Sequence, residues 1–196
     1  MFYKKITVLL TALLLGISLS ACGEYYSKDK KADEKPETTM AGGDPIKSAE
    51  SAGPPDLASK ATIKDWDGKV LRKGSNGWTC LPDMAGTPGN DPWCVDKSWS
   101  SFLDAYMNKK KPSYDQVGVA YMLAGDTAVS NSDPFASKKT TDADWVTGLK
   151  AHLMILIPNV KSLDSYPTEW REGGPWIMWN DTPYEHLMIP IDSMKR

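Results

Sequence analysis

The feature that most constrains the fold is a long stretch with few large apolar residues that ends near residue 60. From Glu24 to Thr39, 9 of 16 residues are charged, and residues 40–60 are rich in glycine, proline and small side chains. Such a composition buries too little apolar surface to offset the entropy that folding costs. We therefore interpret this stretch as a flexible tether and expect residues 61–196 to form a single domain, which is long enough to enclose a core.

The charge balance narrows the range of partners. The chain has 23 basic and 25 acidic residues, which gives a formal net charge of −2. A nucleic-acid-binding protein carries a basic surplus that neutralises phosphates. We therefore expect no nucleic-acid partner.

The N-terminal segment has the pattern of an export signal. Lys4 and Lys5 precede a largely apolar run over residues 6–17, which is the size of a signal-peptide core and too short to span a bilayer. The run leads into Leu19-Ser20-Ala21-Cys22. This segment resembles the lipobox of bacterial lipoproteins. The resemblance implies that residues 1–21 are a signal peptide and that fatty acyl chains such as palmitate are attached at Cys22.

The lipoprotein resemblance also implies a location. Two or three acyl chains hold a protein firmly at a membrane, whereas one binds only marginally. Residues 22–60 would then combine the lipid anchor and the tether. Gly23 follows the cysteine where an aspartate would retain a Gram-negative lipoprotein in the inner membrane. By this sorting rule of bacterial lipoproteins, we expect the domain to be anchored in the outer membrane and to face the periplasm. There it would bind an envelope protein or a small ligand.

The domain sequence predicts one helix among several strands. Residues 62–66 and 69–73 flank Asp67-Gly68, which is typical of a β-hairpin turn. Asp91-Pro92 offers a helix start, and the apolar residues that follow at helical spacing are Val95, Trp99, Phe102, Leu103 and Tyr106. Further strand-like runs cover residues 117–123, 152–157, 176–179 and 185–191. We predict an α+β domain with a mainly antiparallel sheet and one long amphipathic helix packed on one face.

Two cysteines remain once Cys22 is assigned to lipid attachment. Cys80 and Cys94 flank a segment rich in glycine and proline. In an oxidising compartment an even pair of cysteines indicates a disulfide. Closing a loop of this length stabilises a fold by about 3 kcal/mol.

Two of the predicted strands begin alike, with His152-Leu153-Met154-Ile155 and His186-Leu187-Met188-Ile189. Alternation along a strand places the histidine and methionine of each run on one face and the aliphatic residues on the other. Pairing Met178 with His186 and Trp176 with Met188 preserves these faces. We expect the strand at residues 176–179 to lie between the other two. The aliphatic rows would then pack on the helix, and the histidine and methionine rows would lie on the opposite face.

This face carries the most specific chemistry of the domain. Imidazole and thioether ligands suit Cu(I), and the candidate ligands are His152, Met154, Met178, His186 and Met188. The set resembles the ligands of periplasmic copper and silver chaperones in chemistry but not in spacing. We favour the alternative that the methionines fill a second hydrophobic layer and the histidines satisfy backbone groups. The face, including Trp176, could equally be a surface for a partner or small ligand.

A hydrolase is the remaining alternative. His152 or His186 could act as a base that a carboxylate orients, and the candidate carboxylates are Asp126, Asp181 and Glu185. The chain contains no Gly-x-Ser-x-Gly, no His-Glu-x-x-His and no glycine-rich phosphate loop. We assign no catalytic residue and favour a binding or interaction module.

One further resemblance covers most of the domain. It rests on Gly77-Trp78-Thr79-Cys80, on Asp133-Pro134-Phe135-Ala136 and on Pro183-Tyr184 with His186 and Pro190. These motifs are similar to those of uncharacterised secreted bacterial proteins. The resemblance implies no activity and transfers no catalytic residue.

Overall fold

The structure is a computed structural model that describes residues 43–192. The predicted signal peptide, Cys22 and the tether up to residue 42 lie outside the described residues. The helices are α1 (Pro45–Ser51), α2 (Pro55–Ala58) and α3 (Lys97–Met107), with short 3-10 helices η1 (Val160–Leu163) and η2 (Trp170–Glu172). The strands are β1 (Thr62–Lys64), β2 (Val70–Arg72), β3 (Thr79–Leu81), β4 (Trp93–Val95), β5 (Gly118–Met122), β6 (Val129–Ser130), β7 (Trp145–Val146), β8 (His152–Leu156), β9 (Trp176–Met178) and β10 (His186–Pro190).

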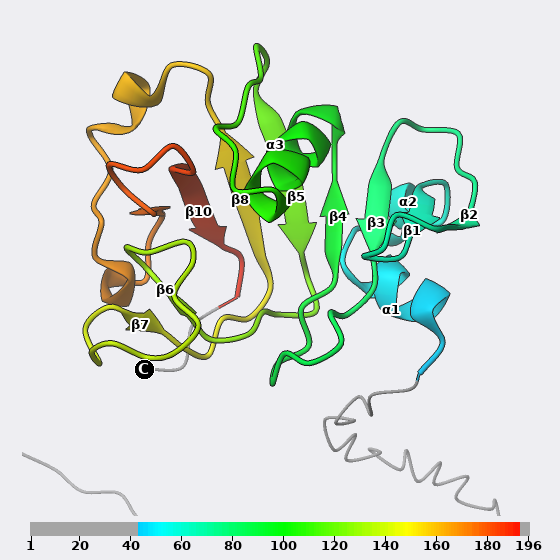
Figure 1. The fold of residues 1–196 in the computed structure, drawn as a ribbon, viewed down its shortest axis with the longest axis horizontal. Helices are drawn as coiled ribbons and strands as arrows, with labels where there is room; N and C mark the ends of the chain where they lie inside the picture. Colours follow the sequence, from blue (N-terminus) through cyan, green and yellow to red (C-terminus); the bar gives the residue numbers. More distant parts are fainter. Residues whose placement is uncertain (1–42, 193–196) are drawn as a thin grey trace, which may run out of the picture. The chain divides into compact units, whose positions relative to one another are not determined.

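Eight of these strands form one sheet in the order β2-β1-β3-β4-β5-β8-β10-β9. Only β1 and β3 pair in parallel, and every other neighbouring pair in this sheet is antiparallel. The strands β6 and β7 form a separate small ribbon. Figure 1 shows α3 lying across the middle of the large sheet and α1 and α2 near the end formed by β1, β2 and β3. The predicted mainly antiparallel α+β architecture is therefore confirmed.

The predicted helix is shorter than expected and begins later. α3 spans 11 residues and begins after Asp96, whose carboxylate accepts the backbone N–H of Trp99 at 2.9 Å. Asp91-Pro92 does not start it, because residues 93–95 form β4 and Cys94 and Val95 pair with β5. Helical spacing from Val95 onward could not reveal this strand, because three residues are too few to show alternation.

The folded domain also begins earlier than residue 61. Asp44 caps α1 by accepting the N–H of Ile46, and Pro45 occupies the first helical position. Ala49, Ala52 and Ala58 are buried in a cluster with both disulfide cysteines. Residues 45–58 are thus part of the domain and not of a flexible tether. Composition obscured this because alanine is only weakly apolar, yet its small side chain allows a helix to approach a sheet closely.

The predicted disulfide between Cys80 and Cys94 is present. The two residues are directly opposite each other on β3 and β4, and both are fully buried. It joins two neighbouring strands. Gly53 packs on this bond so closely that a Cβ atom at this position would lie 3.1 Å from Cβ and Sγ of Cys94. The disulfide therefore also fixes the connection between α1 and α2.

Apolar side chains fill both faces of the sheet. The larger core lies between α3 and the face of β5, β8, β10 and β9 that α3 covers. On the other face, Leu163 from η1 packs with Ile177 and Leu187. Within residues 43–192, no helix has the length and apolar character needed to cross a membrane.

Candidate functional site

The β9–β10 hairpin, which carries three of the five predicted metal ligands, forms in the predicted register. Met178 is opposite His186, and Trp176 is opposite Met188, across the antiparallel pair β9 and β10. Because side chains directly opposite in a strand pair project to the same face, all four lie together. The alternation of this sequence therefore predicted the shared face, and the register expected with it is the one that forms.

The order of the three strands differs from the prediction. β10, not β9, lies in the middle, and it runs antiparallel to β8. Met154 is directly opposite Met188, whereas His152 is opposite Pro190. His152 and His186 therefore lie two side-chain rows apart, on either side of the methionine pair. The long connection from β8 to β9 reaches the edge of the sheet, which local sequence pattern does not reveal.

The helix covers the histidine and methionine face, which corrects the expected arrangement of the two layers. The indole N–H of Trp99 on α3 donates to the carbonyl of Met154 at 3.0 Å. The rings of Trp99 and Phe102 lie 5.3 and 6.1 Å from the ring of His186, edge to face. The aliphatic row packs instead with Leu163. The predicted metal ligands are therefore buried core residues and not an exposed face.

Both histidines are held in the same way. Nδ1 of His152 lies 2.6 Å from the carbonyl oxygen of Lys150, and Nδ1 of His186 lies 2.9 Å from that of Tyr184. A carbonyl oxygen can only accept, so Nδ1 must carry the proton in both rings. Nε2 of each ring then bears a lone pair.

These two lone pairs have no hydrogen-bond partner within residues 43–192. The side chains are 1 % exposed, and burial lowers the pKa of each imidazole to about 4. The Nδ1 hydrogen bonds to the carbonyls oppose this shift, since they favour the protonated ring. Both rings are therefore neutral near pH 7, and each offers an unoccupied nitrogen ligand to the interior.

Aromatic rings surround His186. Trp179, the residue that follows β9, contacts it edge to face at 5.0 Å and stacks on Tyr106 at 5.3 Å with an angle of 12°. Trp179 has a φ of 56°, a left-handed backbone conformation that is unusual for a bulky residue. Such strain is retained where the surrounding structure imposes it. Here it accompanies the placement of the indole ring beside His186.

A carboxyl group approaches the other histidine. Oδ2 of Asp126 lies 3.9 Å from Nε2 of His152, which is beyond hydrogen-bond distance. Burial raises the pKa of Asp126 to about 8, and the nearby Asp91 carboxylate adds to the shift, while the N–H of Thr127 opposes it. Asp126 is therefore mostly protonated at neutral pH.

The other two carboxylates considered for a hydrolase do not reach a histidine. Glu185 accepts the backbone N–H of Asp181 at 3.0 Å, so these two residues contact each other in the loop between β9 and β10. Among the described hydrogen bonds, no carboxylate contacts either imidazole. The arrangement of a base oriented by a carboxylate is therefore not formed.

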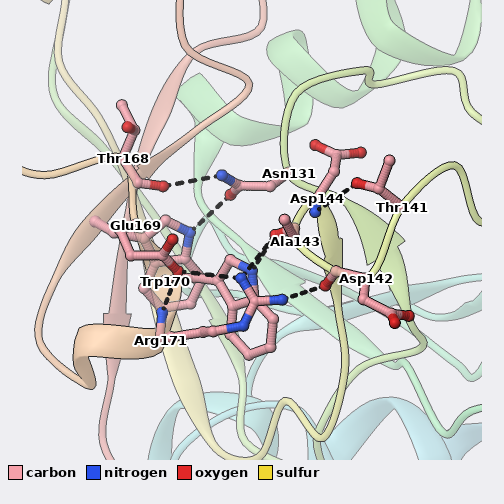
Figure 2. Close-up of polar contacts among 10 residues, drawn as sticks. Asn131, Thr141, Asp142, Ala143, Asp144, Thr168, Glu169, Trp170 and Arg171 are labelled. Carbon is pink, nitrogen blue, oxygen red and sulfur yellow. Dashed lines mark hydrogen bonds and ion pairs between the residues drawn. The ribbon is translucent and has the colours of Figure 1, made fainter.

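Trp176 is not part of an exposed ligand surface in this structure. It is fully buried, and its indole N–H donates to Oδ1 of Asn131 at 3.0 Å. Figure 2 shows that neighbouring residues hold the same loops together: Trp170 and Arg171 donate to the carbonyl of Ala143, and Arg171 also donates to that of Asp142. These contacts connect the β6–β7 ribbon to η2 and are structural.

A polar cluster in the loop between β3 and β4 was not predicted. The N–H of Asp91 donates to Asp83 at 2.8 Å, and the carboxylate of Asp91 accepts the N–H of Met84 at 2.9 Å. Burial raises the pKa of Asp91 to about 6, partly offset by the hydrogen bond from Met84. No local pattern indicates this cluster, because Asp91-Pro92 is also typical of a helix start.

Comparison with models of known protein families, with characterised proteins and with solved structures gives no match. The resemblance of the domain to secreted bacterial proteins therefore stays a prediction. Within residues 43–192, no group of three or more histidine, cysteine, aspartate or glutamate residues is placed to hold a metal ion. A site of imidazole and thioether ligands uses a different set of donors.

Proposed function

We propose that this protein is a lipid-anchored component of the bacterial envelope whose α+β domain is a binding module. The N-terminal sequence supports the anchor, because Lys4, Lys5, the apolar run and Leu19-Ser20-Ala21-Cys22 occur in the order of a lipoprotein signal. Cys22 would carry the acyl chains, and the residues up to about 42 would separate the domain from the membrane.

The observation that carries this proposal is the use of the cysteines. The chain has three, and Cys80 and Cys94 are joined in a fully buried disulfide. Disulfides persist in oxidising compartments such as the periplasm and are rare in the cytosol. An exported domain accounts for this pair, and the one cysteine left over stands at the position of lipid attachment.

Labelling with a fatty acid analogue tests the anchor. The full chain is expressed in a Gram-negative host with an alkyne-bearing palmitate analogue, and the Cys22→Ala variant is compared with wild type. We expect label and membrane association in wild type and neither label nor cleavage in Cys22→Ala. Ser20→Ala is the matched control, because it keeps a small residue in the lipobox and should retain the label. Label in Cys22→Ala would overturn the proposal.

The location in the outer membrane has its own test. Gly23→Asp introduces the residue that, by the habit of the family, retains a lipoprotein in the inner membrane. We expect wild type in the outer-membrane fraction of a density gradient and Gly23→Asp in the inner-membrane fraction. If wild type and Gly23→Asp are found in the same membrane fraction, the proposed location is contradicted, whereas the proposal of lipidation at Cys22 still stands.

A further inference from the structure

His186 has a buried ring nitrogen that nothing in the described part of the chain engages. Its Nε2 has no hydrogen-bond partner there, although the side chain is 1 % exposed. Buried polar atoms in native proteins are almost always paired with protein, water or an ion, because an unpaired one costs about 1–3 kcal/mol. The Nδ1 hydrogen bond to Tyr184 fixes the ring so that Nε2 is the atom with the free lone pair.

The surroundings of His186 determine what could occupy that lone pair. Met178 is directly opposite on β9, and Met188 follows two positions later on β10, so both thioethers lie on the same face. The rings within reach belong to Trp99, Phe102 and Trp179. A thioether is at most a weak acceptor, and the indole N–H groups of Trp99 and Trp179 donate to the carbonyls of Met154 and Ser130, so these neighbours leave the imidazole nitrogen unpaired.

One imidazole nitrogen and two thioether sulfurs are the ligands of a soft monovalent cation. Thioethers select Cu(I), whereas Mg²⁺ and Ca²⁺ require oxygen ligands. All three ligands are neutral, and burying a divalent ion without a charged ligand costs more than burying a monovalent one.

We propose that the β9–β10 hairpin binds one Cu(I) or Ag(I) ion through Nε2 of His186 and the sulfurs of Met178 and Met188. The strained backbone at Trp179 holds an indole ring against this site. His152 lies two side-chain rows away beside Asp126, and we leave it out of the proposed ligand set although its ring interacts electrostatically with that of His186. This inference goes beyond the proposed function, because it requires neither the lipid anchor nor a particular membrane.

The test uses the full chain in detergent with Cys22→Ala as the background. This substitution removes the third cysteine, so no free thiol competes for the metal while the disulfide remains. Binding of Cu(I) is measured without oxygen by competition with a chromophoric Cu(I) chelator, with ascorbate as the reductant, and is repeated with Ag(I) by calorimetry. We expect one equivalent to bind tightly and to quench tryptophan fluorescence, since the indole rings of Trp99, Trp176 and Trp179 lie beside the proposed ligands.

Substitutions locate the ion. Met178→Leu and Met188→Leu nearly conserve volume and are expected to fold, and each should weaken Cu(I) binding by at least about tenfold. Met107→Leu is the matched control, because Met107 is 50 % exposed on α3, and His152→Gln is the second control. X-ray absorption at the copper edge should show nitrogen and sulfur neighbours. No binding below micromolar concentrations, equal affinity in the Met178 and Met107 variants, or loss of binding only in His152→Gln would overturn the proposal.

Discussion

Oδ2 of Asp126 lies 3.9 Å from Nε2 of His152, so a buried acid stands next to a buried base without a hydrogen bond between them. Burial raises the pKa of the acid to about 8 and lowers that of the base to about 4. The proton therefore resides on the carboxyl group across the neutral range. This inverts the usual order of the two groups and makes the stability of the domain depend on pH in two opposite ways.

Asp126→Asn should stabilise the protein at pH 8 and have little effect near pH 4. Because the pKa of Asp126 is raised in the folded state, its contribution to the free energy of unfolding is fully present below pH 3.8 and is lost as the pH rises through 8. Between these two pH values the free energy of unfolding falls by about 1.4 kcal/mol per pH unit. Asparagine stays neutral and can still accept the N–H of Thr127. Urea unfolding across this range measures the difference. Parallel stability curves for the two proteins would show that the carboxyl group is not shifted.

The opposite behaviour is expected at His152. Because the pKa of His152 is lowered in the folded state, the contribution of this residue to the free energy of unfolding is complete above pH 6.5 and is lost as the pH falls through 4. The slope is again about 1.4 kcal/mol per pH unit. His152→Gln should therefore be less sensitive to acid over this interval in metal-free protein. Long-range proton–nitrogen NMR should show the proton on Nδ1 in wild type at pH 6. A proton on Nε2 would contradict the hydrogen bond to Lys150.

The faces of the strands could be predicted from sequence, but their order could not. Strict alternation allows only registers of the β9–β10 hairpin that keep the two faces, and the pairing of Met178 with His186 is one of these. The placement of β10 beside β8 depends on contacts between distant segments, which no local pattern specifies. The same limit explains why the histidine and methionine face was expected away from the helix: periodicity shows which residues share a face, not what covers it.

Small residues and short elements account for the other differences. Ala49 and Ala52 are fully buried, yet their segment is polar and rich in proline, so its composition is typical of a tether. β4 has three residues, too few to show alternation. The buried nitrogen of His186 could not be predicted either, because a sequence does not show which ring atom a carbonyl will engage.

The end of α3 offers a test of backbone strain. Lys109 follows the helix with a φ of 53°, which glycine adopts without steric cost. Lys109→Gly should therefore raise the free energy of unfolding by about 0.5–1 kcal/mol. The loss of the contact between the Lys109 ammonium group and the ring of Phe135 reduces this gain. Lys110→Gly is the matched control, because Lys110 does not have a positive φ and should gain nothing. Thermal unfolding of the two variants, measured side by side, tests this prediction. If neither variant is more stable than wild type, the prediction is contradicted.

Removing the disulfide should cost about 3 kcal/mol, the value for a closed loop of this length. Cys80→Ala/Cys94→Ala is the appropriate variant, since it leaves no buried free thiol at either position. The sulfur of Cys94 beside Gly53 is also removed, whereas the Cβ atom stays. Denaturant unfolding measures the loss, with Cys22→Ala as the control that keeps the disulfide. A loss below about 1 kcal/mol would mean that the pairing of β3 and β4 alone holds this region.

Asp96 should be the most important helix cap in the domain. Its carboxylate accepts the N–H of Trp99 at 2.9 Å and that of Val119 on β5 at 2.7 Å, and so ties the start of α3 to the sheet. Asp96→Ala removes both acceptors and should cost about 2–3 kcal/mol, the sum of a lost cap and an unpaired N–H. Asp96→Asn keeps one acceptor oxygen, so its stability should lie between those of Asp96→Ala and wild type.

Asp44→Ala is the matched control for this prediction. Asp44 caps α1 through one hydrogen bond, to Ile46, and that bond is exposed. Its loss should cost about 1 kcal/mol, the usual value for a cap alone. Denaturant midpoints of the three variants, measured at one pH, give the comparison. If Asp96→Ala costs no more than Asp44→Ala, then the bond to Val119 contributes nothing, and α3 is held over the histidine and methionine face by its apolar contacts alone.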